Sequence, residues 1–345
     1  MSMNELRRDY LLDRWVVIAT QRKRRPTDFV RPKTSGRKDD VCPFCPGNEN
    51  MTPPATLVYM EKGGEIVRER DSNGFRHTGW LVRCIPNLYP AFTWPPKGEV
   101  KEEEDRSFRA LPAVGHHEVI VESPNHDEHP SVASINQLEL IIKAYMDRFR
   151  YFSSREYVKY VSIFRNHGPE AGASLSHAHT QIIAASIMPR IVREELDKAK
   201  AYWNRTSKCV FCNIIRKEEK SNRLIWENKN FIVFSPWASV HPFEFWIFPR
   251  RHQPTILDMS PEEIHDLAVI MRKCFGGLKS LLNDPPYNFG FHMVPDSSFH
   301  WHLEVYPKLS IWAGFEKSTG VFINVFSPEE AASSLREALA REKLL

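Results

Sequence analysis

The same order of features occurs twice along this chain of 345 residues. Each half carries a Cys-x2-Cys pair, a strand-like segment ending in His, a long helical pattern, another strand-like segment and a strand opening on His-x-His. The spacing is nearly the same in both copies, since His126 lies 51 residues before His177 and His252 lies 48 residues before His300. We therefore predict that the chain folds as two similar units.

Apolar residues recur at helical spacing over 134–152 and 260–282, and the second of these segments opens on a Ser-Pro-Glu-Glu start signal. Strands are predicted over 116–123, 160–168, 177–185, 243–252, 287–294 and 300–309. We expect an α+β fold of two tandem units, residues 1–190 and 191–345, each an antiparallel sheet packed against one long helix. A charged helical stretch over 187–208 connects them.

The bulk properties exclude several classes of protein. The composition is globular, with 42% hydrophobic and 26% charged residues, and no stretch of 18 apolar residues occurs. The N-terminal segment lacks the apolar region of a signal peptide. A formal charge of +4 is too small to indicate a nucleic-acid partner but suits an anionic substrate. We expect a cytoplasmic protein with neither a membrane nor a nucleic-acid partner.

The two Cys-x2-Cys pairs indicate metal sites, because zinc in structural sites takes four sulfur or nitrogen ligands. One predicted set comes from the first half and the other from the second. The sets are Cys42, Cys45, His126 and His177, then Cys209, Cys212, His252 and His300. We expect about two zinc ions per chain, with iron as an alternative in the second site because Glu304 is close in sequence. The opposing interpretation is that the histidines cap strands and the cysteines are ordinary loop thiols.

The first His-x-His pair also points to chemistry. If His177 binds a metal, His179 on the same strand face is free, and a neutral imidazole is a competent nucleophile toward phosphorus. The small-residue loop before it can bring main-chain N–H groups and the Ser174 hydroxyl to an anion. Gln181 shares the face and can donate a hydrogen bond to a phosphoryl oxygen. By itself the loop is equally consistent with a plain hairpin connection.

The segment "NHGPEAGASLSHAHTQ" resembles the active-site segment of galactose-1-phosphate uridylyltransferases, the nucleotidyl-transferring branch of the histidine triad superfamily. Asn166, Gly172, Ser174 and Gln181 match that family's pattern around His179. The resemblance covers nearly the whole chain. Four further positions carry over substrate-contacting roles through "RKRRP", "IPNLYPAF" and "AGFEKSTG": Arg22, Arg25, Asn87 and Glu316.

This resemblance implies two histidine-triad-like domains and a double displacement through a nucleotidyl-histidine at His179. The substrates implied are a nucleotide sugar and a sugar 1-phosphate, as in UDP-glucose–hexose-1-phosphate uridylyltransferase of galactose metabolism. The resemblance also implies a structural role for zinc, and we expect a homodimer. The second His-x-His strand, with His302 followed by Glu304, lacks the glycine loop and the glutamine, so only His179 is predicted to react.

Two departures leave the nucleobase and sugar open. The family's middle proline is Ala178 here, and its glycine before the glutamine is Thr180. A "Ser-His-x-His" sequence also occurs in the related ADP-glucose phosphorylases, which makes adenylyl transfer the alternative. A hydrolase of dinucleoside polyphosphates, a zinc-stabilised nucleic-acid-binding module and a binding protein with an inactive triad are further alternatives.

Overall fold

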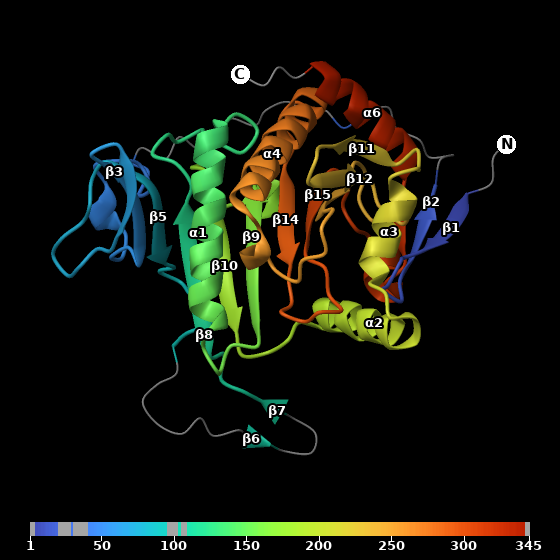
Figure 1. Cartoon of the computed structure of the whole chain (residues 1–345), viewed down its shortest axis with the longest axis horizontal. Coiled ribbons are helices and arrows are strands. Elements are labelled where there is room, and N and C mark those ends of the chain that lie inside the picture. The colour runs from blue at the N-terminus through green and yellow to red at the C-terminus, as the bar shows by residue number, and fades with distance from the viewer. Residues whose placement is uncertain (1–3, 20–28, 30–40, 95–102, 105–108, 342–345) are drawn as a thin grey trace.

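The computed structural model describes residues 4–19, 29, 41–94, 103–104 and 109–341. Its central feature is an 11-stranded antiparallel sheet in the order β11-β12-β13-β15-β14-β9-β10-β8-β5-β3-β4 (Figure 1). Two smaller sheets accompany it, one of three strands and one of two. The fold is therefore α+β with a large antiparallel sheet, as predicted.

Strands from both halves of the chain build the central sheet. Those of the first half are β3 (Leu57–Lys62), β4 (Glu65–Glu69), β5 (Trp80–Pro86), β8 (Gly115–Val121), β9 (Tyr160–His167) and β10 (His179–Ala185). Those of the second half are β11 (Leu224–Glu227), β12 (Phe231–Phe234), β13 (Phe245–Pro249), β14 (Tyr287–His292) and β15 (His302–Pro307).

The two halves join edge to edge through β9 and β14, which are the equivalent strands of the two repeats. They pair antiparallel, with Asn166 opposite Asn288 and His167 opposite Tyr287. The predicted pair of sheets is thus one continuous sheet. One hydrophobic core, which includes Ile141 and Leu267, draws on both halves. The division into residues 1–190 and 191–345 stays a prediction.

Two long helices, α1 (Ile135–Ser153) and α4 (Pro261–Leu282), lie side by side on one face of the sheet (Figure 1). Their starts follow from local chemistry. The Ser134 hydroxyl accepts a hydrogen bond from the Gln137 N–H, and Ser260 and Glu263 form a capping box at the start of α4. Each helix buries an apolar stripe against the sheet, and α6 (Pro328–Arg341) packs against α4.

The remaining elements surround this core. They include the helices α2 (Arg190–Thr206), α3 (Val210–Glu218) and α5 (Gly314–Thr319) and the paired strands β6 (Glu103–Glu104) and β7 (Arg109–Ala110). Single 3-10 turns cover η3 (Glu49–Met51), η4 (Pro169–Ala171) and η5 (Ile256–Asp258). The three-stranded sheet consists of β1 (Glu5–Arg8), β2 (Trp15–Ile18) and β16 (Phe322–Asn324). The N-terminal strands therefore lie beside C-terminal elements, because β2 pairs parallel with β16.

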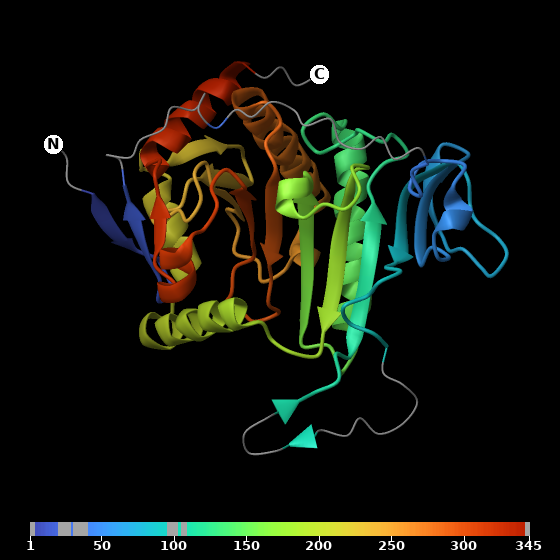
Figure 2. The same ribbon diagram turned by 180° about the vertical axis from the view of Figure 1, so that it is seen from behind.

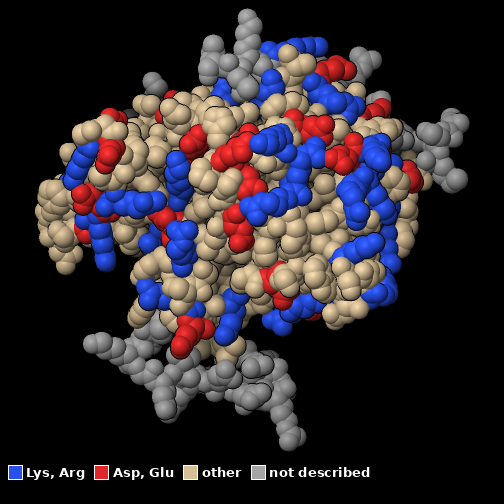
Figure 3. Space-filling model, viewed as in Figure 1, with Lys and Arg blue, Asp and Glu red and all other residues tan. Residues whose placement is uncertain are grey.

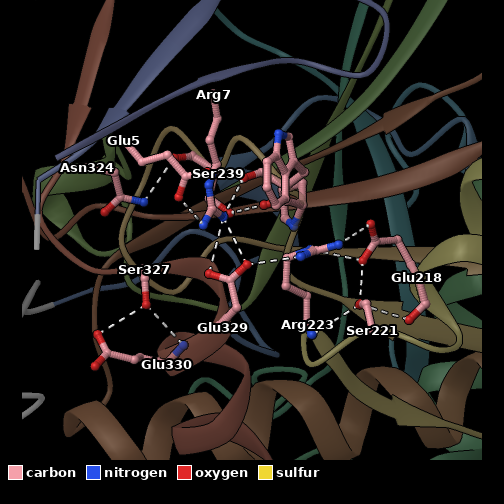
Figure 4. Close-up of polar contacts among 12 residues, drawn as sticks. Glu5, Arg7, Glu218, Ser221, Arg223, Ser239, Asn324, Ser327, Glu329 and Glu330 are labelled. Carbon is pink, nitrogen blue, oxygen red and sulfur yellow. Dashed lines mark hydrogen bonds and ion pairs between the residues drawn. The ribbon is translucent and has the colours of Figure 1, made fainter. Parts of the chain in front are cut away.

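A partly buried polar network supports this arrangement (Figure 4). The Arg7 guanidinium donates to the Glu329 carboxylate at 2.9 Å and lies 3.9 Å above the ring of Trp237. Arg223 donates to the same Glu329 oxygen at 3.0 Å and to Glu218 at 2.8 Å. One carboxylate on α6 thus connects the first strand with the segment after α3.

The face covered by α1 and α4 is a mixed surface on which Lys and Arg side chains lie among Asp and Glu (Figure 3). None of the described helices combines the length and the apolar character needed to cross a bilayer.

Candidate active site and metal centres

His179 begins β10, and the alternation of side chains along that strand decides which way it faces. The Thr180 hydroxyl lies 2.8 Å from the Tyr145 hydroxyl of α1, so Thr180 points to the helix-covered face. Neighbouring residues of a strand point to opposite faces, which places His179 and Gln181 on the other face. Figure 2, turned by 180° from Figure 1, looks onto that face, and the 3-10 turn at Pro169–Ala171 lies in front of it.

The imidazole of His179 is buried, and one hydrogen bond holds it in a single tautomer. Its Nδ1 lies 2.7 Å from the main-chain carbonyl oxygen of His177, and because a carbonyl only accepts, Nδ1 carries the hydrogen. The lone pair is then on Nε2, which has no hydrogen-bond partner among the described residues. Burial lowers the pKa of His179, so the ring is neutral near pH 7.

A buried ion pair supports the strand from the helix side. Arg165 and Glu122 are 1% and 0% exposed, and the guanidinium donates to the carboxylate and, at 3.1 Å, to the main-chain oxygen of His179. The hydroxyls of Thr180 and Tyr145 donate to the other oxygen of Glu122. The network therefore anchors the backbone at His179 and Thr180, and it gives Thr180 a structural role where the family pattern has glycine.

Gln181 is held by His117 of the neighbouring strand. Its Oε1 lies 2.7 Å from Nε2 of His117 on β8. The Nδ1 of His117 accepts a hydrogen bond from the Ala91 N–H at 3.2 Å. The main-chain oxygen of His117 accepts another from the Asn87 N–H at 2.9 Å, which brings the predicted nucleotide segment beside Gln181.

The loop before His179 is shaped by side chains from both halves. Asn288 of β14 donates through its amide nitrogen to Asn166 Oδ1 and to the Ala171 oxygen, both at 2.8 Å. Gly172 has φ 88°, a left-handed conformation that glycine adopts without strain. Ser174 is exposed on the same loop. The predicted loop residues thus lie together before β10, but no described group bonds the Ser174 hydroxyl.

The first predicted metal set lies together. Its four ligand atoms, from Cys42, Cys45, His126 and His177, are all within 4.8 Å of one another. Sulfur to Nδ1 distances are 3.4 to 3.6 Å, and tetrahedral zinc with normal bond lengths separates sulfur and nitrogen by about 3.5 Å. Nε2 of His177 donates to the Ser123 oxygen at 2.8 Å, which leaves the Nδ1 lone pair for a metal.

The second set, Cys209, Cys212, His252 and His300, also lies within 4.8 Å. Cys212 Sγ is 3.5 Å from Nδ1 of each histidine. Cys212 belongs to α3, and Cys209 precedes that helix as its N-cap residue. Both sets fit a tetrahedral zinc ion by donor type and spacing.

His302 occupies the position that corresponds to His179, yet its surroundings differ. Its Nδ1 lies 3.2 Å from the His300 oxygen, but Nε2 is already paired with Glu304 at 3.2 Å. The ring stacks on Phe248 with 4.6 Å between centroids. Glu304 is thus a partner of His302 rather than of the cysteine cluster. Together with Glu195 and His292, these two residues form a third group of possible metal ligands within 4.8 Å.

Other predicted residues lie apart or cannot be placed. Glu316 caps α5 by accepting from the Ala313 N–H at 3.0 Å, and α5 packs beside β16 of the three-stranded sheet. The structure does not bring Glu316 to His179 within one chain. Arg22 and Arg25 lie outside the described residues.

The residues missed from the sequence are His117, Glu122, Arg165 and Asn288. Each acts across strands, so its role depends on register, which the one-dimensional pattern does not give. The only available signal was charge in apolar strands, as in "VIVES" and "SIFRN".

Comparisons with known proteins agree with this geometry. Residues 126–344 match a family model described as a domain of unknown function, DUF4921. The chain is 34% identical over 343 residues to the ADP-glucose phosphorylase of Arabidopsis thaliana, covering 96% of this chain and 92% of that protein. It is 30% identical over 348 residues to the galactose-1-phosphate uridylyltransferase of Thermotoga maritima, covering 97% and 98%.

Solved structures give the same picture. The crystal structure of an ADP-glucose phosphorylase from Arabidopsis thaliana with bound ADP-glucose matches with a TM-score of 0.78 and 30% identity, over 97% of this chain and 99% of that chain. A uridylyltransferase structure matches with a TM-score of 0.74 and 27% identity, over 98% and 99%.

Proposed function

Since the chain belongs to the galactose-1-phosphate uridylyltransferase family, whose members are nucleotidyltransferases, we propose that it transfers a nucleotidyl group from a nucleotide sugar through a covalent intermediate on His179. The observation that carries this proposal is the tautomer of His179. Its Nδ1–H is committed to the His177 carbonyl at 2.7 Å, which leaves the Nε2 lone pair as the nucleophile.

In the first half-reaction, Nε2 attacks the α-phosphorus of the nucleotide sugar. A phosphorus–nitrogen bond forms, and the bond from the α-phosphorus to the bridging oxygen breaks, which releases the sugar 1-phosphate. In the second, an oxygen of an acceptor phosphate attacks the same phosphorus and frees His179. Because leaving group and acceptor are both phosphates, one site serves both steps. Gln181, on the same strand face, donates to a phosphoryl oxygen as charge develops.

Zinc bound by the two Cys/His sets would support this chemistry structurally, without taking part in the reaction. Bound zinc would fix the ring of His177, whose carbonyl orients His179. A closed four-ligand site contributes folding free energy and has no open position for substrate. We therefore assign zinc a structural role in both sites; the iron alternative for the second site loses its basis, because Glu304 pairs with His302 instead.

Two acceptors are in question. We predict a UDP-glucose–hexose-1-phosphate uridylyltransferase acting in galactose metabolism, in which the acceptor is a sugar 1-phosphate. The second candidate is an ADP-glucose phosphorylase, in which the acceptor is inorganic phosphate. Two observations support this second candidate. The Arabidopsis relative has the higher sequence identity, 34% against 30%, and the "Ser-His-x-His" sequence also occurs in the phosphorylases.

A labelling experiment tests the common proposal and separates the candidates. The protein is incubated with UDP-glucose or ADP-glucose carrying 32P at the α-phosphorus, quenched, and the adduct is mapped by peptide mass analysis. We expect label on His179 with one of the two donors, released by galactose 1-phosphate for the uridylyltransferase or by phosphate for the phosphorylase. Absence of any adduct would overturn the proposal.

Assembly as a homodimer is part of the proposal. Ile311 is 84% exposed and Phe315 is 49% exposed, and both lie near Glu316, which α5 holds away from the central sheet. Exposed apolar side chains grouped in this way are typical of interaction surfaces. Sedimentation analysis should give about twice the mass of one chain.

A further inference from the structure

We propose that His117 is a positioning residue that sets the orientation of the Gln181 side-chain amide. The inference rests on the proposed function, because it concerns how Gln181 meets the phosphoryl group. It starts from three hydrogen-bonding groups that converge on one imidazole: the Ala91 N–H, the Gln181 amide and the Asn87 amide.

The Ala91 contact fixes the tautomer of His117. A main-chain N–H only donates, and it lies 3.2 Å from Nδ1, so Nδ1 must be unprotonated. In a neutral ring the hydrogen is then on Nε2. Burial lowers the pKa of His117, which keeps the ring neutral near pH 7, although the bond to Gln181 acts in the opposite direction.

The tautomer of His117 in turn fixes Gln181. Because Nε2–H donates, the atom of Gln181 that lies 2.7 Å away must be the carbonyl oxygen and not the amide nitrogen. The NH2 group therefore points away from His117, and no described residue accepts a hydrogen bond from it. It is a free donor on the strand face that carries His179, where a phosphoryl oxygen has to bind.

The Asn87 amide makes the one described contact at this ring that the assigned tautomer does not satisfy. Its Oδ1 accepts from the Tyr89 N–H at 2.8 Å, so its nitrogen is the atom found 3.2 Å from His117 Nε2. A protonated Nε2 offers that nitrogen no lone pair. Both groups are donors in this tautomer, so the Asn87 NH2 group does not bond to His117 and is available as a donor within the segment that the resemblance assigns to nucleotide contact.

The sheet register explains how the two residues meet. His117 pairs with Ile183 across the β8–β10 ladder, and Gln181 pairs with Val119, so His117 and Gln181 are diagonal neighbours on one face. His116 lies on the opposite face, where its ring contacts Phe152 of α1. It provides a matched control one residue away.

A double-mutant cycle tests the proposal, with the single-turnover rate of nucleotidyl-enzyme formation as the readout. We expect His117→Ala to lower this rate about 10-fold to 100-fold, the range for a misplaced catalytic group. His117→Phe, which keeps a ring but has no donor, should lose about the same factor. In the Gln181→Ala background, His117→Ala should change the rate by less than about twofold, because nothing remains to be oriented. His116→Ala should leave the rate unchanged.

The outcomes separate this proposal from the one on which it rests. If the unsubstituted protein forms no adduct, the proposed function fails. If the adduct forms but the double variant loses the product of the two single factors, His117 acts independently of Gln181 and the positioning role is overturned. A His117→Phe variant with the full rate would also overturn it. Zinc content and thermal unfolding, measured on every variant, check that each one is folded.

Discussion

The main-chain carbonyl of His177 accepts the Nδ1 hydrogen of His179 at 2.7 Å, so a predicted metal ligand and the proposed nucleophile are joined through the backbone. Any group that fixes His177 thereby also fixes the ring that we propose to react. The side chain of His179 is not itself one of the predicted ligands, so its reactivity can be removed by substitution while the four ligands stay in place.

His179→Asn should abolish the covalent adduct while zinc content and unfolding temperature stay close to those of the unsubstituted protein, because all four predicted ligands remain. His302→Asn is the matched control and should still form the adduct, since His302 is paired with Glu304 and stacked on Phe248. Label that persists in His179→Asn would place the nucleophile elsewhere.

Elemental analysis should find about two zinc ions per chain. Cys45→Ser should remove one of them and lower the unfolding temperature, because a closed site contributes folding free energy. Cys84→Ala is the control, since Cys84 is buried in the hydrophobic core outside both Cys/His sets. Equal zinc content in Cys45→Ser and Cys84→Ala would argue against the first site.

Arg165→Met should destabilise the protein by about 3–5 kcal/mol, because it leaves the Glu122 carboxylate buried without its cation. Urea unfolding at pH 7 measures this loss. The comparison is Lys229→Ala, which breaks a pair whose side chains are 73% and 59% exposed and should cost far less stability than the buried pair, because solvent screens it. A similar loss of unfolding free energy in the two variants would show that the buried ion pair contributes no more stability than an exposed one.

Glu329→Gln should lower stability by about 1–3 kcal/mol, the range for weakened hydrogen bonds to charged groups. The carboxylate accepts hydrogen bonds from both Arg7 and Arg223, and a neutral amide accepts them less strongly. We expect the rate of adduct formation to stay unchanged, since the network lies at the three-stranded sheet. Thermal unfolding combined with the labelling assay checks both statements.

Arg25→Ala should raise KM for the sugar 1-phosphate and lower kcat/KM by about 1.5–3 kcal/mol, because an Arg fork binds phosphate oxygens directly. Arg24→Ala is the matched control, since it removes the same side chain one position earlier in the sequence. Steady-state kinetics on the two variants separate a specific phosphate contact from a general basic loop. Equal effects would favour the basic loop.

The features that the sequence predicted well are those with a fixed spacing. The Cys-x2-Cys pairs and the histidines that follow them predicted which side chains lie together, and the structure groups them as expected. The helical patterns likewise predicted α1 and α4 to within a residue or two. Metal binding itself stays a prediction.

The support of the site could not be predicted in the same way. His117 meets Gln181 because β8 and β10 pair in one register, and a shift of one residue would turn His117 to the other face. The same holds for Glu122 and Arg165, which meet only after β8, β9 and β10 are side by side. The joining of the half-sheets also depends on strand edges, for which the chain has no local signal.

The junction of β9 and β14 has a consequence for how such a chain arose. Equivalent strands that pair antiparallel are what a two-fold axis produces between identical subunits. The chain is thus organised as a fused dimer, in which α2 makes the partner permanently available. The matching order of elements is the order that duplication of one unit produces. One copy kept an open imidazole at His179, while the other closed the equivalent position with a carboxylate and stacked rings.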